Sequence, residues 1–128
     1  MTKSTFMDKY PVYSYELLKT EIKENSIDEI IEYFKAQIEA HPIAAYIATF
    51  DHYSHTKNLG GEINPEIKNA KNLVFCFGPA IPNTKVIAVR PRSVGVAELE
   101  DRFVIEFMEA PKEEIHTIME KWTKGLGV

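Results

Sequence analysis

The sequence predicts an α+β fold, and two observations lead to that prediction. Two segments, 27–40 and 111–124, carry apolar residues at the three-to-four-residue spacing of amphipathic helices. Short apolar, β-branched and aromatic runs separated by turn residues surround and connect them, which is the pattern of strands. Strands joined by short turns pair in the antiparallel sense, and amphipathic helices cover one face of such a sheet.

The length and the net charge of the chain limit the classes of protein to which it can belong. The chain has 128 residues, which is the usual size of one domain, so we expect a single domain over 1–128. Its formal net charge is −4. Sequence-independent binding to nucleic acid, or binding to anionic lipid, requires a positively charged protein surface. We therefore expect no nucleic-acid partner and no membrane partner.

The N-terminal residues and the single cysteine bear on localisation. Residues 1–10 are mostly polar and are expected to form a loosely ordered arm without the apolar region of a signal peptide. The longest apolar run, 43–48, is far shorter than a membrane span. Cys76 has no partner for a disulfide and lies in an apolar run, so it is expected to be a buried core residue in a reducing compartment. These observations predict a cytoplasmic protein.

The first strand and the first helix follow one another. Segment 12–22 alternates like a strand, and the break in alternation at Leu18 suggests a bulge or an edge position. Ser26 and Glu29 have the spacing of a capping box, in which each side chain satisfies an exposed backbone amide. The apolar stripe that follows predicts a helix over 27–40.

The middle of the chain predicts three strands and one long connection. Segment 43–50 is apolar and is expected to be a buried strand. Segment 51–69 is a polar stretch that is long for a connection within a compact domain, and such loops are commonly functional or mobile. Segments 73–77 and 85–90 are predicted as the next two strands.

The C-terminal third predicts a hairpin and a second helix. Segments 94–99 and 103–108 are separated by a tight turn and are expected to pair with each other. Pro111 suits the first position of a helix, which we expect over about 111–124.

The order of these elements predicts a ferredoxin-like or split-βαβ antiparallel sheet. Both helices are expected on one face, with an extra C-terminal hairpin and a right-handed first crossover. Because 43–50 and 73–77 are apolar on both sides, the second face needs a cover. The 51–69 loop or a second subunit would supply it, and the sheet face is a natural place for a symmetric homodimer.

A possible metal site lies where the strand 43–50 ends. Asp51, His52 and His55 are ligand types suited to zinc, iron, nickel or copper. Residues three apart converge on a turn or short helix but diverge in a strand. The alternative is that they are ordinary polar loop residues. Tyr53, in the same cluster, is a candidate ligand-binding residue.

A possible anion site lies around Pro91. Arg90 and Arg92 share strand parity, so both guanidinium groups should point to one face and could bind a carboxylate or phosphate. The alternative is that they pair with nearby acids of the chain, namely Glu98, Glu100 or Glu106. No nucleophile elbow or other catalytic pattern stands out, and we nominate no catalytic residue or cofactor.

Three segments carry a resemblance to a known family. They are Phe-Asp-His-Tyr-Ser-His-Thr-Lys at 50–57, Phe-Cys-Phe-Gly at 75–78 and Val-Arg-Pro-Arg-Ser at 89–93. With them the chain resembles a small family of uncharacterised bacterial proteins, a domain of unknown function, over most of its length. The resemblance implies a bacterial single-domain protein and transfers no activity, cofactor or catalytic residue.

Three functions compete at this point. The first is a non-catalytic binding or regulatory module that self-associates. The second is a metal- or cofactor-binding protein that uses Asp51, His52 and His55. The third is a small enzyme or sensor that holds an anionic metabolite with Arg90 and Arg92.

Overall fold

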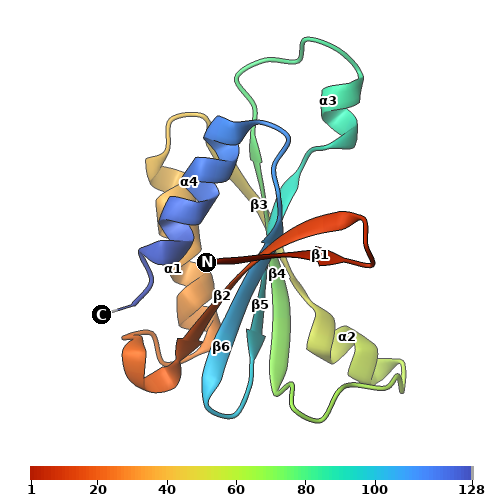
Figure 1. Ribbon diagram of the computed structural model, residues 1–128, viewed down its shortest axis with the longest axis vertical. Coiled ribbons are helices and arrows are strands. Elements are labelled where there is room, and N and C mark those ends of the chain that lie inside the picture. Colours follow the sequence, from red (N-terminus) through yellow and green to blue (C-terminus); the bar gives the residue numbers. More distant parts are fainter. Residues whose placement is uncertain (128) are drawn as a thin grey trace.

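A six-stranded sheet carries two long helices on one of its faces (Figure 1). The computed structural model describes residues 1–127. The strands are β1 (Thr2–Phe6), β2 (Tyr10–Leu18), β3 (Ala44–Asp51), β4 (Asn69–Phe77), β5 (Arg92–Glu98) and β6 (Arg102–Met108). The helices are α1 (Ile27–Ala40), α2 (His52–Asn58), α3 (Lys85–Ala88) and α4 (Glu113–Lys124), with a 3₁₀ turn at Lys19–Glu21.

The strand order is β1-β2-β6-β5-β4-β3, and every neighbouring pair is antiparallel. This confirms the predicted α+β class and the antiparallel sheet. The ferredoxin-like detail is not confirmed. Helix α1 connects β2 to β3 across the three strands β6, β5 and β4, and no strand follows α4 within residues 1–127.

The first helix and the hairpin follow the sequence prediction closely. Helix α1 has the predicted bounds, and the hydroxyl of Ser26 accepts the backbone N–H of Glu29 at 3.2 Å. The carboxylate of Glu29 reaches back to the N–H of Asn25, one residue before the cap, at 2.8 Å. Strands β5 and β6 form the predicted hairpin. Helix α4 begins at Glu113, two residues after Pro111.

One apolar core lies between the sheet and helices α1 and α4 (Figure 1). Alternate residues of the central strands enter it, among them the fully buried Phe75, Phe103 and Ile105. Trp122 of α4 stacks on Phe77, with ring centroids 5.5 Å apart. Burying each large side chain of this kind contributes roughly 1.5–3 kcal/mol, which offsets the entropy lost on folding. Phe34 occupies the centre of the α1 stripe with no exposed surface.

The expectation of a loose N-terminal arm is wrong. Residues 2–6 form β1, which pairs with β2 in the register Thr2 opposite Ser14. The turn between them has two residues with positive φ, Met7 and Asp8, in place of the glycine that marks such turns in a sequence. Strand β1 is exposed along its length, so no alternation of apolar residues reveals it.

The expected bulge at Leu18 is also misplaced. Strand β2 stays in register as far as Leu18, which lies opposite Arg102, and the 3₁₀ turn then begins. The irregularity lies instead in β3, where the register shifts between Tyr46 and Ala48. The strand predicted over 12–22 therefore ends four residues early.

Three predictions for the middle of the chain need correction. The strand expected to be buried over 43–50 is the edge strand β3, whose Ile47 is 53% exposed. The connection 51–69 contains α2. Segment 85–90 is not a strand, because α3 occupies most of it.

No helix among residues 1–127 has the length and apolar character needed to cross a membrane.

Candidate ligand pocket

A pocket of about 350 Å³ opens at one end of the sheet, on the side that carries the helices. Its walls are the 78–91 segment, which includes α3, and the first turns of α4. Most of its lining is apolar, with Phe77, Val89 and Ile118 among the contributors. Pockets of this size are typical of small-molecule sites in proteins.

Arg92 is the most buried charged group in this lining. It starts β5 opposite Phe75 and shares a face with the core residue Val94, so its side chain lies on the helix side. One Nη2 hydrogen is donated to the carbonyl oxygen of Met108, while the buried Nε has no hydrogen-bond partner. Burial lowers the pKa of Arg92 from its ordinary value. An arginine nonetheless stays cationic at neutral pH.

Arg90 lies beside it in the same pocket. The Arg90–Pro91 peptide bond is cis, and the guanidinium donates from Nη1 to the carbonyl oxygen of Ala80 at 2.9 Å. Neither Arg90 nor Arg92 forms an ion pair with any residue of the described chain. Two of the acids considered as their partners are engaged elsewhere, Glu98 with Lys19 and Glu106 with a hydroxyl of β2.

The start of α4 adds a third cation and one acid. Lys112 and Glu114 line the pocket and form an exposed ion pair at 3.6 Å. The lining thus holds three cations against one carboxylate, and the N-terminal end of α4 adds the positive end of its dipole. The pocket is therefore apolar in its walls and positive in its charge.

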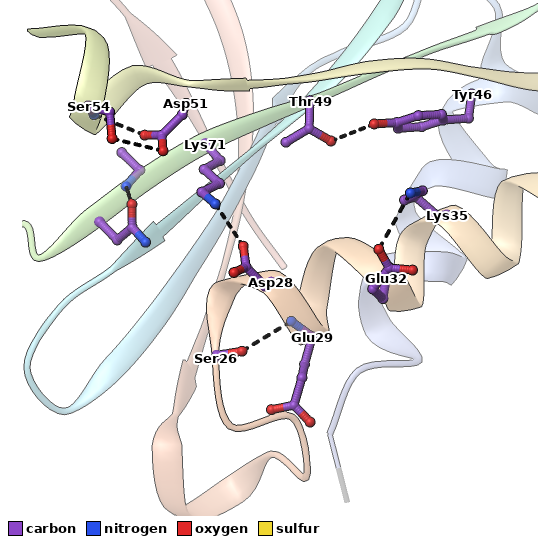
Figure 2. A network of polar contacts seen from close by, with 12 residues as sticks. Ser26, Asp28, Glu29, Glu32, Lys35, Tyr46, Thr49, Asp51, Ser54 and Lys71 are labelled. Atoms are coloured by element: carbon purple, nitrogen blue, oxygen red, sulfur yellow. Dashed lines mark hydrogen bonds and ion pairs between the residues drawn. The ribbon is translucent and has the colours of Figure 1, made fainter.

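The cluster at α2 has a different arrangement, seen in Figure 2. Asp51 caps α2, with one carboxylate oxygen accepting the backbone N–H of Ser54 at 2.9 Å and the other its hydroxyl at 3.0 Å. The backbone hydrogen bond from Ser54 is the main reason that the pKa of Asp51 is held below its usual range. The same figure shows Lys71 of β4 reaching Asp28 of α1 at 2.7 Å, which ties the sheet to that helix.

The side chains of His52 and His55 do not converge with Asp51 on a common point, as the ligands of one metal ion would. Nε2 of His52 hydrogen-bonds the side-chain oxygen of Asn72. Both rings pack against Phe50, with centroids at 4.8 Å for His52 and 5.3 Å for His55. Among residues 1–127, no three histidine, cysteine or acidic side chains are grouped as a metal site would need. The metal site stays a prediction.

The predicted site residues thus fall into two places. Arg90 and Arg92 line one pocket, whereas Tyr53 is half-buried on α2 and takes no part in that lining. Helices α2 and α3 lie toward opposite ends of the sheet (Figure 1). The arginines and the histidines therefore do not share a cavity.

The apolar wall of the pocket escaped the sequence prediction. Val86 and Val89, which line it, were assigned to a strand. One local signal marks α3. The side-chain oxygen of Asn83 accepts the backbone N–H groups of Lys85 at 3.0 Å and Val86 at 3.2 Å, which is how asparagine starts a helical turn.

Fold and pocket together define a small α+β domain with a positively charged apolar pocket at one end of its sheet. The chain belongs to the family described as "Family of unknown function (DUF6858)", whose family model matches residues 1–127. This confirms the predicted membership of an uncharacterised family. No curated protein matches the chain.

A solved structure supports the fold. It is the crystal structure of uncharacterized conserved protein DUF302 from Bacillus stearothermophilus, to which the chain is similar with a TM-score of 0.62 and 12% sequence identity. The similarity covers 88% of this chain and 94% of that one. At this identity the likeness concerns the fold alone. Both families found are of unknown function, in agreement with the prediction that no specific function can be assigned from the sequence.

Proposed function

We propose that this domain is a non-catalytic binding module for a small organic anion with an apolar body. The observation that carries the proposal is the position of Arg90 and Arg92. Both line a pocket of about 350 Å³ with mostly apolar walls, and neither is neutralised by a carboxylate of the described chain.

The energetics of Arg92 support an anionic ligand. A buried charge without a partner is costly, and a bound carboxylate offsets that cost with charge-assisted hydrogen bonds. The buried Nε of Arg92 has no hydrogen-bond partner within the described chain, so the protein itself leaves part of this charge uncompensated. A guanidinium group presents its donors in a fork that matches two carboxylate oxygens, so Arg92 can hold a carboxylate with defined orientation.

The apolar walls favour an organic anion over an inorganic one. Phe77, Val86 and Ile118 offer hydrocarbon surface that a bare phosphate or sulfate would leave uncovered. A ligand with an alkyl or aromatic body covers that surface and gains about 25 cal/mol for each Å² removed from water. The class that fits both parts of the pocket is a monocarboxylate with a short chain or ring.

The proposal includes the context in which the domain works. We propose that it self-associates as a homodimer and that it acts in the cytoplasm of a bacterium. The single unpaired cysteine, Cys76, supports a reducing compartment.

Calorimetric titration with octanoate tests the ligand proposal. Octylamine has the same chain with the opposite charge, and acetate has the charge without the chain. We expect octanoate to bind and the other two to bind at least about tenfold more weakly, since each lacks one half of the match.

Variants locate the binding site. Arg92→Gln should weaken octanoate binding by about tenfold or more, the equivalent of roughly 1.4 kcal/mol. Arg102→Gln is the matched control, because Arg102 pairs with Glu16 and is not part of the pocket lining. Equal binding by Arg92→Gln and wild type, or no heat with octanoate, would rule out the proposed pocket.

A further inference from the structure

The face of the sheet opposite α1 and α4 is largely uncovered. In Figure 1 the two long helices lie on one side of the sheet, and the β1–β2 hairpin and α2 project on the other. Helix α2 packs against β4 and so lies toward one edge of the sheet. We call the face opposite α1 and α4 the open face.

The register of the strands identifies the side chains on the open face. Because directly opposite residues of antiparallel strands point to the same side, one row can be followed across the whole sheet. The row consists of Phe50, Asn72, Gly95, Glu106, Ser14 and Thr2. A second row places Ala70, Ala97 and Val104 beside it. The middle of the open face is therefore hollowed around Gly95, where a pocket of about 350 Å³ is lined by Asn72, Gly95 and Glu106 among others.

We infer that a second copy of this chain covers the open face, packed sheet against sheet about a two-fold axis near Gly95. The inference rests on the proposed self-association and names the surface responsible. Small side chains let two sheets approach to about 10 Å, the spacing of packed sheets. A two-fold interface must be complementary to itself, and the row through Gly95 meets that condition.

The complementarity lies in the two polar residues that flank Gly95. On one side, the side-chain oxygen of Asn72 is engaged by His52, which leaves the amide hydrogens of Asn72 free to donate. On the other side, Glu106 presents a carboxylate that accepts a hydrogen bond from Ser14 at 2.6 Å and has room for another. A two-fold axis that runs parallel to the strands, midway between the two sheets and above Gly95, exchanges the two positions. The amide of each copy then faces the carboxylate of the other.

The area of the face fits a weak dimer. Strands about 4.8 Å apart and about seven residues long, at about 3.3 Å per residue, give the four central strands a face of roughly 450 Å². Two such faces bury roughly 900 Å² in total, which is the size of weak interfaces that form at micromolar or higher concentration. The other charges on the face are matched within one subunit, since Arg102 pairs with Glu16 at 3.1 Å.

Sedimentation analysis of the full chain, from low to high micromolar concentration, tests the inference. We expect wild type to form dimers and Gly95→Arg to be monomeric, with a dissociation constant raised at least about 100-fold by a long cation at the axis. A Cβ at Gly95 would lie 3.5 Å from the carbonyl oxygen of Glu106 and 3.7 Å from the amide nitrogen of Asn72, so the sheet itself accepts a side chain there. Gly95→Ala is the conservative control and should dimerise within a few-fold of wild type.

A control outside the face separates this surface from others. Ile87 is 59% exposed on α3, away from the open face, so Ile87→Arg should leave the dimer intact. A wild-type chain that stays monomeric throughout would overturn both this inference and the proposed self-association. A dimer that survives Gly95→Arg, or that is lost in Ile87→Arg alone, would overturn the inference about the surface only.

A pair of isosteric variants tests the predicted contact and does not depend on Gly95. Asn72→Asp would place a carboxylate opposite the partner's carboxylate, so we expect dimerisation to weaken by about tenfold. Adding Glu106→Gln should restore most of that loss, because an amide then faces the new carboxylate. If Glu106→Gln gives no such rescue, the proposed two-fold arrangement is wrong.

Discussion

His116 and His41 both pack against aromatic rings, but their ring nitrogens differ in hydrogen bonding. The centroid of the His116 ring lies 4.2 Å from that of Tyr13. Its Nδ1 is buried without a partner, and its buried Nε2 has the carboxylate of Glu120 at 3.5 Å. The His41 ring contacts Phe77, while its Nδ1 accepts the backbone N–H of Ile43 at 3.3 Å. A buried polar atom without a partner costs about 1–3 kcal/mol, so the imidazole of His116 lowers the free energy of unfolding.

Replacing each histidine by phenylalanine should therefore have different effects. We expect His116→Phe to raise the free energy of unfolding by about 1 kcal/mol, because the unsatisfied Nδ1 is removed, an aromatic ring is kept, and the 3.5 Å contact of Nε2 with Glu120 is too long for a strong hydrogen bond. His41→Phe should give no gain, since it removes an accepted hydrogen bond. Urea denaturation monitored by Trp122 fluorescence measures both. A loss of stability in His116→Phe would show that its nitrogens are satisfied in solution.

At the scale of elements, capping and periodicity were enough to predict α1 and the β5–β6 hairpin. Both depend on residues close in the sequence: Ser26 with Glu29 for the helix, and a two-strand alternation around a tight turn for the hairpin. Strand β1 could not be predicted in this way. Its stability comes from pairing with β2, and its exposed side chains carry no periodic pattern. Helix α3 was predicted as a strand because it contains β-branched residues. Their preference for strands is weak and is often overridden by packing against the rest of the fold.

Helix α2 offers a pH-dependent test, because its cap is ionised. The pKa of Asp51 is lowered mainly by the backbone N–H of Ser54, so the folded state favours the carboxylate. Its contribution to stability is complete above the ordinary aspartate range of about pH 4 and is lost as the pH falls through the depressed pKa. Asparagine caps helices about as well as aspartate but does not titrate.

We therefore expect the stability difference between wild type and Asp51→Asn to depend on pH. It should be close to zero at neutral pH, where the ionised aspartate and asparagine cap α2 about equally well, and wild type should become the less stable of the two as the pH falls through the depressed pKa of Asp51. Urea denaturation at several pH values measures it. Ser54→Ala serves as a companion variant: it removes the hydroxyl donor but keeps the backbone N–H, so most of the pH dependence should remain. A difference that does not change on acidification would contradict the assigned cause.

At the scale of the whole molecule, long-range arrangement explains what the sequence could not predict. Arg90 and Arg92 were found because they are neighbours in sequence with the same parity. The wall that makes their surroundings a pocket comes from α4, more than twenty residues away along the chain, and from α3. Likewise, the apolar segment 43–50 looked buried, but the strand order places it at an edge.

The same arrangement puts the proposed pocket and the open face on opposite sides of one sheet. Arg92 points to the helix side, whereas Gly95, three residues later in β5, lies on the open face. Residues three apart in a strand are separated by about 10 Å, a distance at which free-energy changes usually add within about 0.5 kcal/mol. Arg92 itself links the two sides, because it donates a hydrogen bond to the carbonyl oxygen of Met108 and also lines the hollow around Gly95.

We expect the two surfaces to act independently. Gly95→Arg should bind octanoate with an affinity within about twofold of wild type, and Arg92→Gln should dimerise like wild type. Calorimetry on the first variant and sedimentation on the second measure these outcomes. A tenfold change in either would mean that ligand and partner compete for the bond between Arg92 and Met108. Binding in the pocket would then control the association of the subunits.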